Sequence, residues 1–153
     1  MQTPSSSLIF SDVGIVGAGA MGRGIAQLAA QAGSRVWLYD TSSHAAEQAR
    51  TALDHQWQSL VAKGRLAPDA AQAYLARVSV AQDLQAFAPC TLVVEAAIER
   101  LDIKQHVFAD LERIVSAETV LATNTSSLPI TAIAARLKRP QRFAGYHFFN
   151  PAP

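Results

Sequence analysis

The sequence has few of the features that mark secreted, membrane-spanning or nucleic-acid-binding proteins. Its one cysteine, Cys90, cannot form an internal disulfide. Charged or turn-forming residues interrupt every apolar run before the roughly 20 residues that a transmembrane helix needs. The 13 Lys and Arg against 12 Asp and Glu give a net charge of +1, too weak a field to attract nucleic acid or an anionic membrane. The first residues lack the basic start and long apolar run of a secretory signal. We therefore expect a soluble cytoplasmic protein without nucleic-acid or membrane partners, in which any bound anion is held by local groups.

Short apolar runs alternate with helix-forming segments along most of the chain. Strands are predicted over residues 13–16, 35–39, 78–81, 91–95, 119–122 and 143–148, and helices over 20–32, 42–63, 68–77, 101–115 and 130–137, with a helical turn or two around 84–87. This alternation is typical of a mostly parallel sheet with helices on both faces. We therefore predict a doubly wound Rossmann-type α/β domain over residues 12–153, after a flexible leader over residues 1–11.

A glycine-rich turn follows the first predicted strand. Gly17, Gly19 and Gly22 match the G-x-G-x-x-G pattern at a strand-to-helix turn. Ala20 and Met21 stand between the second and third glycines. In this pattern the first glycine makes the tight turn, the second lets a pyrophosphate approach the backbone, and the third lets the helix pack on the strand. The N–H groups and positive dipole end of the helix then bind the phosphates. The turn predicts a dinucleotide site.

An acidic residue ends the second predicted strand. Asp40 follows the first glycine of the turn at close to the ~20 residues expected for the acid that binds the adenosine ribose. Its carboxylate can accept hydrogen bonds from both ribose hydroxyls but would repel a 2′-phosphate, which favours NAD over NADP. Arg23, beside the turn, is interpreted as a solvated residue of the first helical turn, although it could soften that preference.

Three later stretches resemble the 3-hydroxyacyl-CoA dehydrogenase family. They are Val93-Val94-Glu95-Ala96 with Glu99 and Lys104, then Ala122-Thr123-Asn124-Thr125-Ser126-Ser127-Leu128, and then Gly145-Tyr146-His147-Phe148-Phe149-Asn150-Pro151. With the glycine turn they follow the family's order and spacing over almost the whole chain. The resemblance implies NAD-dependent oxidation of a 3-hydroxyacyl-CoA to the 3-oxoacyl-CoA, in fatty acid β-oxidation or related acyl-CoA catabolism.

The resemblance also implies two catalytic residues. His147 would be the base that removes the hydroxyl proton, a role for which a neutral imidazole titrates in the right range. Ser126 would meet both the substrate oxygen and the cofactor. A histidine at a strand end is often only structural, and Ser126 or Ser127 could instead cap the helix starting near Ile130.

Further positions resemble cofactor and substrate contacts of the family. Glu99, Lys104, Asn124 and Asn150 would line the nicotinamide and its ribose, although Glu99 and Lys104 could equally be surface charges at a helix start. Lys63 would approach the CoA phosphates, although lysines are common at helix ends for dipole reasons. The histidines lack metal-ligand spacing, so we expect no metal. Cys90 is interpreted as a small buried residue, and the basic run 138–142 as a solvated loop rather than a phosphate site.

The family resemblance also implies parts beyond residue 153. In the family a glutamate about a dozen residues past the histidine orients it, and a separate helical domain supplies dimer contacts and much of the acyl pocket. We therefore expect a homodimer for the full-length protein, and expect the 153 residues alone to bind NAD but to turn over poorly.

Two other readings stay open. Short-chain 3-hydroxyacid or imine-reducing dehydrogenases also begin with a glycine turn containing Met-Gly, but they typically use a later lysine as their acid and lack the His-Phe-Phe-Asn-Pro run. A non-catalytic NAD-binding or structural protein of the same family is the third possibility, against which Ser126 and His147 argue. The sequence leaves the acyl chain open among short, long and dicarboxylic substrates.

Overall fold

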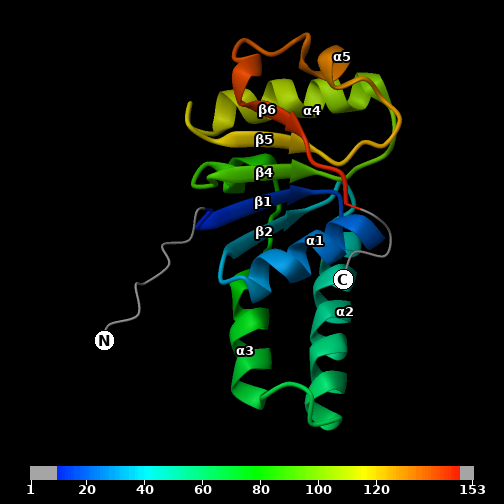
Figure 1. Cartoon of the computed structure of the whole chain (residues 1–153), viewed down its shortest axis with the longest axis vertical. Coiled ribbons are helices and arrows are strands. Elements are labelled where there is room, and N and C mark those ends of the chain that lie inside the picture. The colour runs from blue at the N-terminus through cyan, green and yellow to red at the C-terminus, as the bar shows by residue number, and fades with distance from the viewer. Residues whose placement is uncertain (1–9, 149–153) are drawn as a thin grey trace.

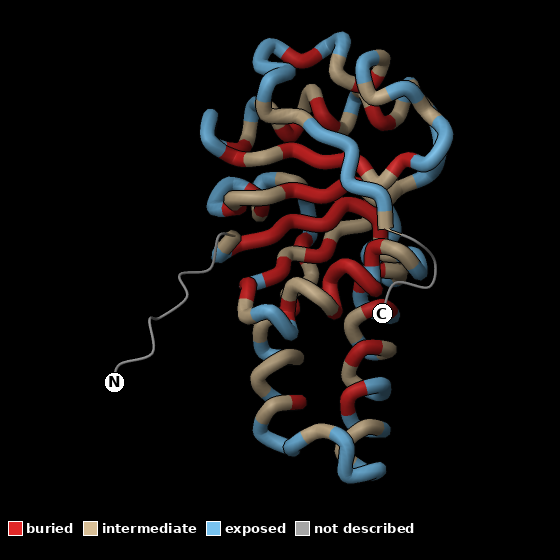
Figure 2. The backbone as a smooth tube through the Cα atoms, viewed as in Figure 1, coloured by how far each residue is buried: buried red, intermediate tan, exposed pale blue. Residues whose placement is uncertain are grey.

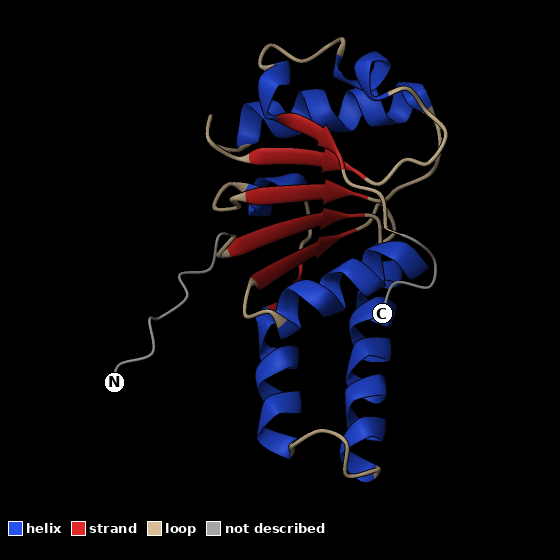
Figure 3. Cartoon of the chain, in the orientation of Figure 1, coloured by secondary structure: helices blue, strands red, loops and turns tan. Residues whose placement is uncertain are grey.

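The computed structural model describes residues 10–148 of the chain (Figure 1). Its centre is a sheet of six parallel strands in the order β3-β2-β1-β4-β5-β6 (Figure 3). The strands are β1 (Asp12–Val16), β2 (Arg35–Tyr39), β3 (Val78–Val80), β4 (Leu92–Glu95), β5 (Val120–Thr123) and β6 (Phe143–Gly145). After β3 the chain crosses back to lie beside β1 as β4, so the strand order reverses there. The predicted doubly wound Rossmann-type fold is confirmed.

Helices cover both faces of the sheet, as its near-continuous apolar strands require. One face carries α1 (Ala20–Gln31), α2 (Ser43–Ala62) and α3 (Pro68–Arg77), and the other carries η1 (Leu84–Phe87), α4 (Leu101–Ile114) and α5 (Ile130–Ala134). A last turn, η2 (Pro140–Arg142), leads into β6. Each face has its own core cluster, and the fully buried β1 contributes Ile15 to one and Val16 to the other (Figure 2). The sheet therefore forms a rigid base for the loops that follow its strands.

The helices α2 and α3 form a hairpin that projects away from the sheet (Figure 1). Ser42 caps α2, because its Oγ accepts a hydrogen bond from the N–H of Ala45 at 3.3 Å. Gly64, with φ of +67°, ends this helix, and Pro68 occupies the first turn of α3. These three residues bound the helices close to the predicted ranges 42–63 and 68–77.

Two elements, α5 and β6, are each three residues shorter than expected. The helix predicted over 130–137 ends at Ala134, because Leu137 N–H bonds the carbonyl of Ala134 in a tighter turn. The N–H groups of Lys138 and Arg139 then donate to the Glu112 carboxylate instead of to helical carbonyls. The strand predicted over 143–148 ends at Gly145, because its neighbour β5 ends at Thr123 and offers no further strand to pair with.

The start of the described chain is tied to the sheet. Phe10 packs against the core cluster of α1–α3, and its carbonyl accepts a hydrogen bond from Ser34 Oγ at 2.7 Å. The rest of the expected leader, residues 1–9, lies outside the described residues. No helix within residues 10–148 is long and apolar enough to cross a membrane.

Candidate cofactor-binding and active site

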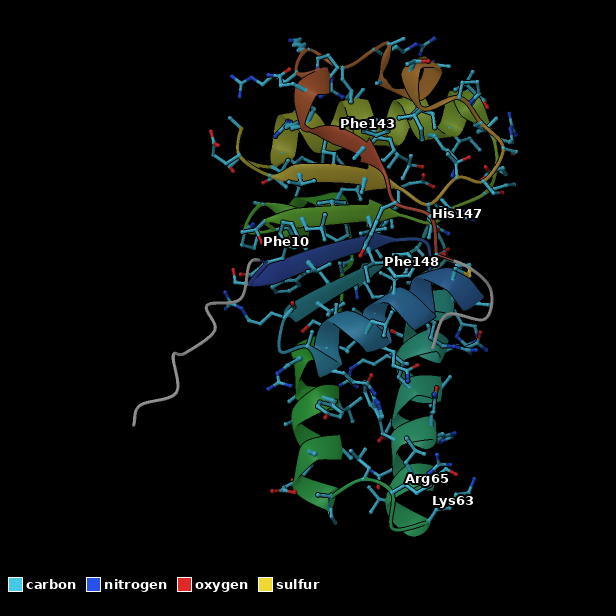
Figure 4. The ribbon with its side chains drawn as sticks, in the orientation of Figure 1. Phe10, Lys63, Arg65, Phe143, His147 and Phe148 are labelled. Atoms are coloured by element: carbon cyan, nitrogen blue, oxygen red, sulfur yellow. The ribbon has the colours of Figure 1, made fainter. Side chains whose placement is uncertain are left out.

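The predicted site residues gather at the carboxyl edge of the sheet. The glycine turn follows β1, Asp40 follows β2, Glu99 lies beyond β4, Ser126 follows β5 and His147 follows β6. Figure 4 shows His147 and Phe148 at this edge, close to the start of α1. In open α/β sheets, ligands bind in the crevice at this edge where the strand order reverses. The position is therefore that of a dinucleotide site.

Each glycine of the turn has its own surroundings. Gly17 has φ of +104°, and a Cβ there would lie 2.5 Å from the carbonyl oxygen of Ala96. A Cβ on Gly22 would lie 1.8 Å from the carbonyl oxygen of Gly17, so only glycine lets α1 approach β1 this closely. A Cβ on Gly19 would meet nothing within 4 Å. Gly19 therefore faces open space that the fold itself does not use, as expected for a glycine that a phosphate approaches.

The start of α1 is open to an anion. Its N-cap, Gly19, has no side chain to accept a hydrogen bond, and the first turn holds no acidic residue. The first backbone bond of the helix runs from Arg23 N–H to the Gly19 carbonyl at 2.9 Å. The N–H groups that precede it have no partner within the helix, and they carry the positive end of the dipole. Arg23 is exposed in the first turn, as expected.

Asp40 connects the end of β2 to the glycine turn. Its Oδ2 accepts a hydrogen bond from Ala18 N–H at 2.8 Å, and its Oδ1 accepts one from Ser42 N–H at 3.0 Å. The Thr41 hydroxyl also donates to Oδ1, at 3.5 Å. A carboxylate has about four lone-pair sites, so Oδ2 keeps acceptor capacity for a ribose hydroxyl. The half-buried carboxylate is thus fixed in place beside the turn.

A cleft of about 300 Å³ brings the predicted catalytic residues together. Ser126 and His147 both line it, and so do Met21 from the start of α1, Glu99 and Asn124. Five predicted site residues, one from the start of α1 and four from the loops after β4, β5 and β6, therefore share one hollow next to the glycine turn. Asn150 lies outside the described residues.

The segment that carries His147 is held from both sides. Tyr146 N–H donates to the carbonyl of Thr123 at 2.8 Å. Two residues later, Phe148 N–H donates to Oδ1 of Asn124 at 2.7 Å. His147 therefore lies between two hydrogen bonds to the end of β5, one to a backbone carbonyl and one to a side-chain amide oxygen.

Glu99 organises the loop that carries Ser126. Its Oε1 accepts hydrogen bonds from the hydroxyl of Thr125, from Ser126 N–H at 3.3 Å and from the Ser127 hydroxyl at 3.3 Å. Burial alone would raise the pKa of Glu99, but the Thr125 hydrogen bond and the Lys104 ammonium outweigh it and hold this pKa below its usual value. Glu99 is therefore ionised at neutral pH, and it ties the loop after β4 to the loop after β5.

Lys104 lies underneath this loop. It is 1% exposed, so the expectation that it could be a surface charge at a helix start is wrong: the first turn of α4 turns it toward the sheet. Its Nζ lies 2.6 Å from Oε2 of Glu95 and 3.5 Å from Oε2 of Glu99. Thr123 Oγ1 donates to the other Glu95 oxygen at 2.7 Å. A buried charge that is paired and hydrogen-bonded in this way is costly to disrupt.

Sequence reasoning assigned no role to Glu95, Thr123 or Thr125, although all three support the cleft. A carboxylate at the end of a buried strand was the available signal for Glu95, because it needs a cation within reach.

The caps proposed for α5 are not found: its N-cap is Pro129 without a side-chain bond, and Thr125 Oγ1 accepts from Leu128 N–H at 3.1 Å.

Two other predicted residues lie away from the cleft. Lys63 is exposed at the far end of the α2–α3 hairpin, next to Arg65 (Figure 4). Cys90 is buried, as expected, and burial together with the charge of Asp12 raises the pKa of its thiol to about 12. Within residues 10–148, no three His, Cys, Asp or Glu side chains are grouped to hold a metal ion.

A model of the family described as 3-hydroxyacyl-CoA dehydrogenase, NAD binding domain, matches residues 12–153. The chain is 45% identical over 141 residues to the 3-hydroxyadipyl-CoA dehydrogenase of Escherichia coli, covering 92% of the chain and 30% of that protein. It is also 45% identical over 140 residues to a probable 3-hydroxybutyryl-CoA dehydrogenase of Deinococcus radiodurans, covering 92% of the chain and 50% of that protein. The chain thus spans half or less of the length of these curated relatives.

Solved structures agree with these matches. The crystal structure of 3-hydroxybutyryl-CoA dehydrogenase from Escherichia coli superposes with a TM-score of 0.92 at 44% identity, over 95% of this chain and 31% of that one. A 3-hydroxyisobutyrate dehydrogenase from Mycobacterium tuberculosis, at 16% identity and a TM-score of 0.57 over 90% of this chain and 39% of that one, shares the fold alone.

Proposed function

Because the chain belongs to the 3-hydroxyacyl-CoA dehydrogenase family as its NAD-binding domain, we propose that it is the cofactor half of an enzyme that oxidises a 3-hydroxyacyl-CoA to the 3-oxoacyl-CoA. The observation that carries this proposal is the single cleft that joins Ser126 and His147 to Met21 at the glycine turn. A substrate hydroxyl group in this cleft would lie near a base, near a hydroxyl that can donate a hydrogen bond, and beside the turn that binds the cofactor.

The glycine turn and Asp40 fit NAD. The uncapped start of α1 receives the pyrophosphate, the open space at Gly19 lets it approach, and Asp40 accepts the adenosine ribose hydroxyls. The negative charge of Asp40 disfavours a 2′-phosphate, so we infer a preference for NAD over NADP. When bound, NAD supplies the acceptor for the hydride that leaves the substrate carbon.

His147 and Ser126 act on the substrate oxygen. The neutral imidazole of His147 takes the hydroxyl proton as the C–H bond gives up its hydride and the carbon–oxygen bond becomes a carbonyl. The Ser126 hydroxyl donates to that oxygen while negative charge develops on it. In the reverse reaction, protonated His147 returns the proton.

Glu99, Lys104 and Asn124 keep these groups in position. Glu99 holds the backbone of Ser126, and Lys104 holds Glu99 from beneath. Asn124 holds the segment of His147 through Phe148 N–H. The sequence-based role of Lys104 at the nicotinamide ribose stays a prediction, and the geometry favours its acting through Glu99, because its Nζ already faces two carboxylates.

The remaining assignments concern the whole protein. We propose that Lys63 contacts the phosphates of the acyl-CoA, that residues beyond 153 shape the acyl pocket and form a homodimer, and that the enzyme acts in the cytoplasm. Relatives named for 3-hydroxybutyryl-CoA and 3-hydroxyadipyl-CoA make short and dicarboxylic acyl chains the first substrates to try.

The test is His147→Ala in the full-length protein, with 3-hydroxybutyryl-CoA as substrate and NADH formation as the signal. Loss of the base should lower kcat by about 100-fold or more while the Kd for NAD stays unchanged. The matched control is His106→Ala, which removes an exposed histidine on α4. If the two variants had the same kcat, His147 would not be the catalytic base. A structural role for the cleft would then be favoured.

A further inference from the structure

A second hollow lies at the opposite edge of the sheet from the cleft. It occurs where α4 ends and β6 begins, whereas His147 follows the carboxyl end of β6 (Figure 1). Its volume is about 460 Å³, within the range of small-molecule sites. Five basic side chains line it: Arg113, Arg136, Lys138, Arg139 and Arg142. We call this the basic hollow, and it shares no lining residue with the cleft of Ser126 and His147.

The basic hollow concentrates positive charge in a nearly neutral chain. The whole sequence carries 13 Lys and Arg and a net charge of only +1, yet five of those cations surround this one cavity. Glu112 is the acidic residue that lines it, and both carboxylate oxygens already accept backbone N–H groups, from Lys138 at 2.9 Å and Arg139 at 2.8 Å. Arg113 pairs with Asp110, and Arg142 lies 4.0 Å from the Glu112 carboxylate. Three cations, Arg136, Lys138 and Arg139, have no carboxylate partner within residues 10–148. The cations outnumber the nearby carboxylates, and a concave surface focuses their field.

Hydrogen bonds anchor the backbone of the loop that carries these cations. Glu112 fixes the backbone at Lys138 and Arg139, as described above. The Arg142 side chain is 8% exposed, and its guanidinium donates to the carbonyls of Ser116 and Thr119. The Nε of Arg142 is buried and has no hydrogen-bond partner within residues 10–148. Residues 138–141 are exposed, as expected for a solvated loop, whereas the Arg142 side chain is built into the fold.

We propose that the basic hollow binds a diphosphate or triphosphate group at a site separate from the cofactor site. Guanidinium groups bind phosphate oxygens in pairs, and four of the five cations are arginines. A single carboxylate would leave most of these charges unpaired, whereas a chain of phosphates offers several charges within one small volume. The group comes either from inorganic pyrophosphate or from the phosphate end of a nucleotide.

Titration of the chain with inorganic pyrophosphate tests this proposal. The titration is followed by NMR at low salt in saturating NAD, so that the glycine turn is already occupied. We expect the amide signals of residues around the hollow to shift, and we expect a parallel titration with ADP to identify the source. A lower Kd for ADP than for pyrophosphate indicates a nucleotide. A Kd for ADP that is not lower indicates the inorganic ion.

Substitutions locate the binding. Both Arg136 and Arg139 are exposed, so replacing them with Gln leaves the core intact. The double variant should raise the Kd for pyrophosphate by about tenfold or more, and raised salt should weaken binding. Arg65→Gln, at the tip of the hairpin, is the control for loss of a positive charge elsewhere and should leave the Kd unchanged. The proposal is overturned if no signal around the hollow shifts by about 10 mM pyrophosphate, or if the double variant and the control bind alike.

Discussion

At the scale of single residues, Gly19 and Gly22 share one turn but meet opposite surroundings. We expect Gly22→Ala to cost about 3 kcal/mol or more of unfolding free energy, because its Cβ would overlap the Gly17 carbonyl oxygen. Gly19→Ala should cost less than about 1 kcal/mol, since its backbone is extended and its Cβ meets open space. The same substitution should raise the Kd for NAD by about tenfold or more, because the methyl group occupies the path of the pyrophosphate.

Urea unfolding and NAD titration measure the two effects separately. Each variant is the other's control, because the chemical change is the same methyl group. If Gly19→Ala bound NAD as tightly as the unchanged chain, the pyrophosphate would lie elsewhere. If Gly22→Ala unfolded at the same urea concentration, α1 would be free to move away from β1.

Asp40 decides between two cofactors through one charge. Asp40→Asn keeps an oxygen that can accept the Ala18 N–H but removes the negative charge. We expect the ratio of NADP to NAD affinity to rise by about tenfold, mostly through weaker NAD binding and loss of repulsion of the 2′-phosphate. Isothermal titration with both cofactors measures the ratio, and Asp54→Asn on α2 is the control for net charge. A ratio that stays constant would show that Asp40 serves only to hold the turn.

Single residues also show where sequence patterns stop being informative. The glycine spacing and the terminal acid of β2 are local, so Gly17, Gly22 and Asp40 could be predicted with their surroundings. Burial is not local. Lys104 lies in the exposed-looking first turn of a helix, and only the packing of α4 against β4 places its ammonium beside Glu95.

At the scale of elements, the loop after β5 depends on a carboxylate from the loop after β4. We expect Glu99→Gln to speed amide hydrogen exchange at Ser126, because the amide oxygen is a weaker acceptor than a carboxylate. Because the pKa of Glu99 is lowered in the folded chain, its tether stabilises the fold above its ordinary pKa of about 4.5 and is lost as pH falls through the lower folded value. Exchange at Ser126 should therefore accelerate below that pH.

Hydrogen exchange followed by NMR from pH 6 down to pH 3 measures this dependence, with rates corrected for the intrinsic effect of pH (about tenfold per unit). Glu118→Gln, at an exposed turn before β5, is the control. A Glu99→Gln variant that keeps the acid transition would assign it to another carboxyl group.

The elements whose ends are set by local caps could be predicted closely, and the others could not. Ser42 and Gly64 bound α2 in the sequence itself, and Pro68 begins α3. The ends of α5 and β6 depend on partners far along the chain. The Glu112 carboxylate binds the N–H groups that would continue α5, and the length of β5 limits the length of β6. Such long-range competition leaves no mark in the local pattern.

At the scale of the whole molecule, the alternation of strands and helices was enough to predict the sheet and the edge where ligands bind. The two core clusters explain why: each strand must be apolar on both faces, and each helix on one. The basic hollow could not be predicted in this way, because Arg113 comes from α4 and Arg136 from the segment after α5. Only the folded chain brings them together.

The whole chain should bind NAD as one folded unit. Saturating NAD at about 100 times its Kd should add about 2.7 kcal/mol of unfolding free energy, which corresponds to a rise in Tm of about 5 to 10 °C. At the same NAD concentration, a tenfold higher Kd in Gly19→Ala should remove about half of that rise. Turnover of 3-hydroxybutyryl-CoA by these 153 residues alone should stay below about 1 per second, because they span half or less of the length of the relatives they match. Differential scanning fluorimetry and NADH absorbance measure the two quantities on the same sample. Turnover at a rate typical of enzymes would show that His147 and Ser126 need no support from outside this domain, and a Tm that NAD does not change would contradict the cofactor site itself.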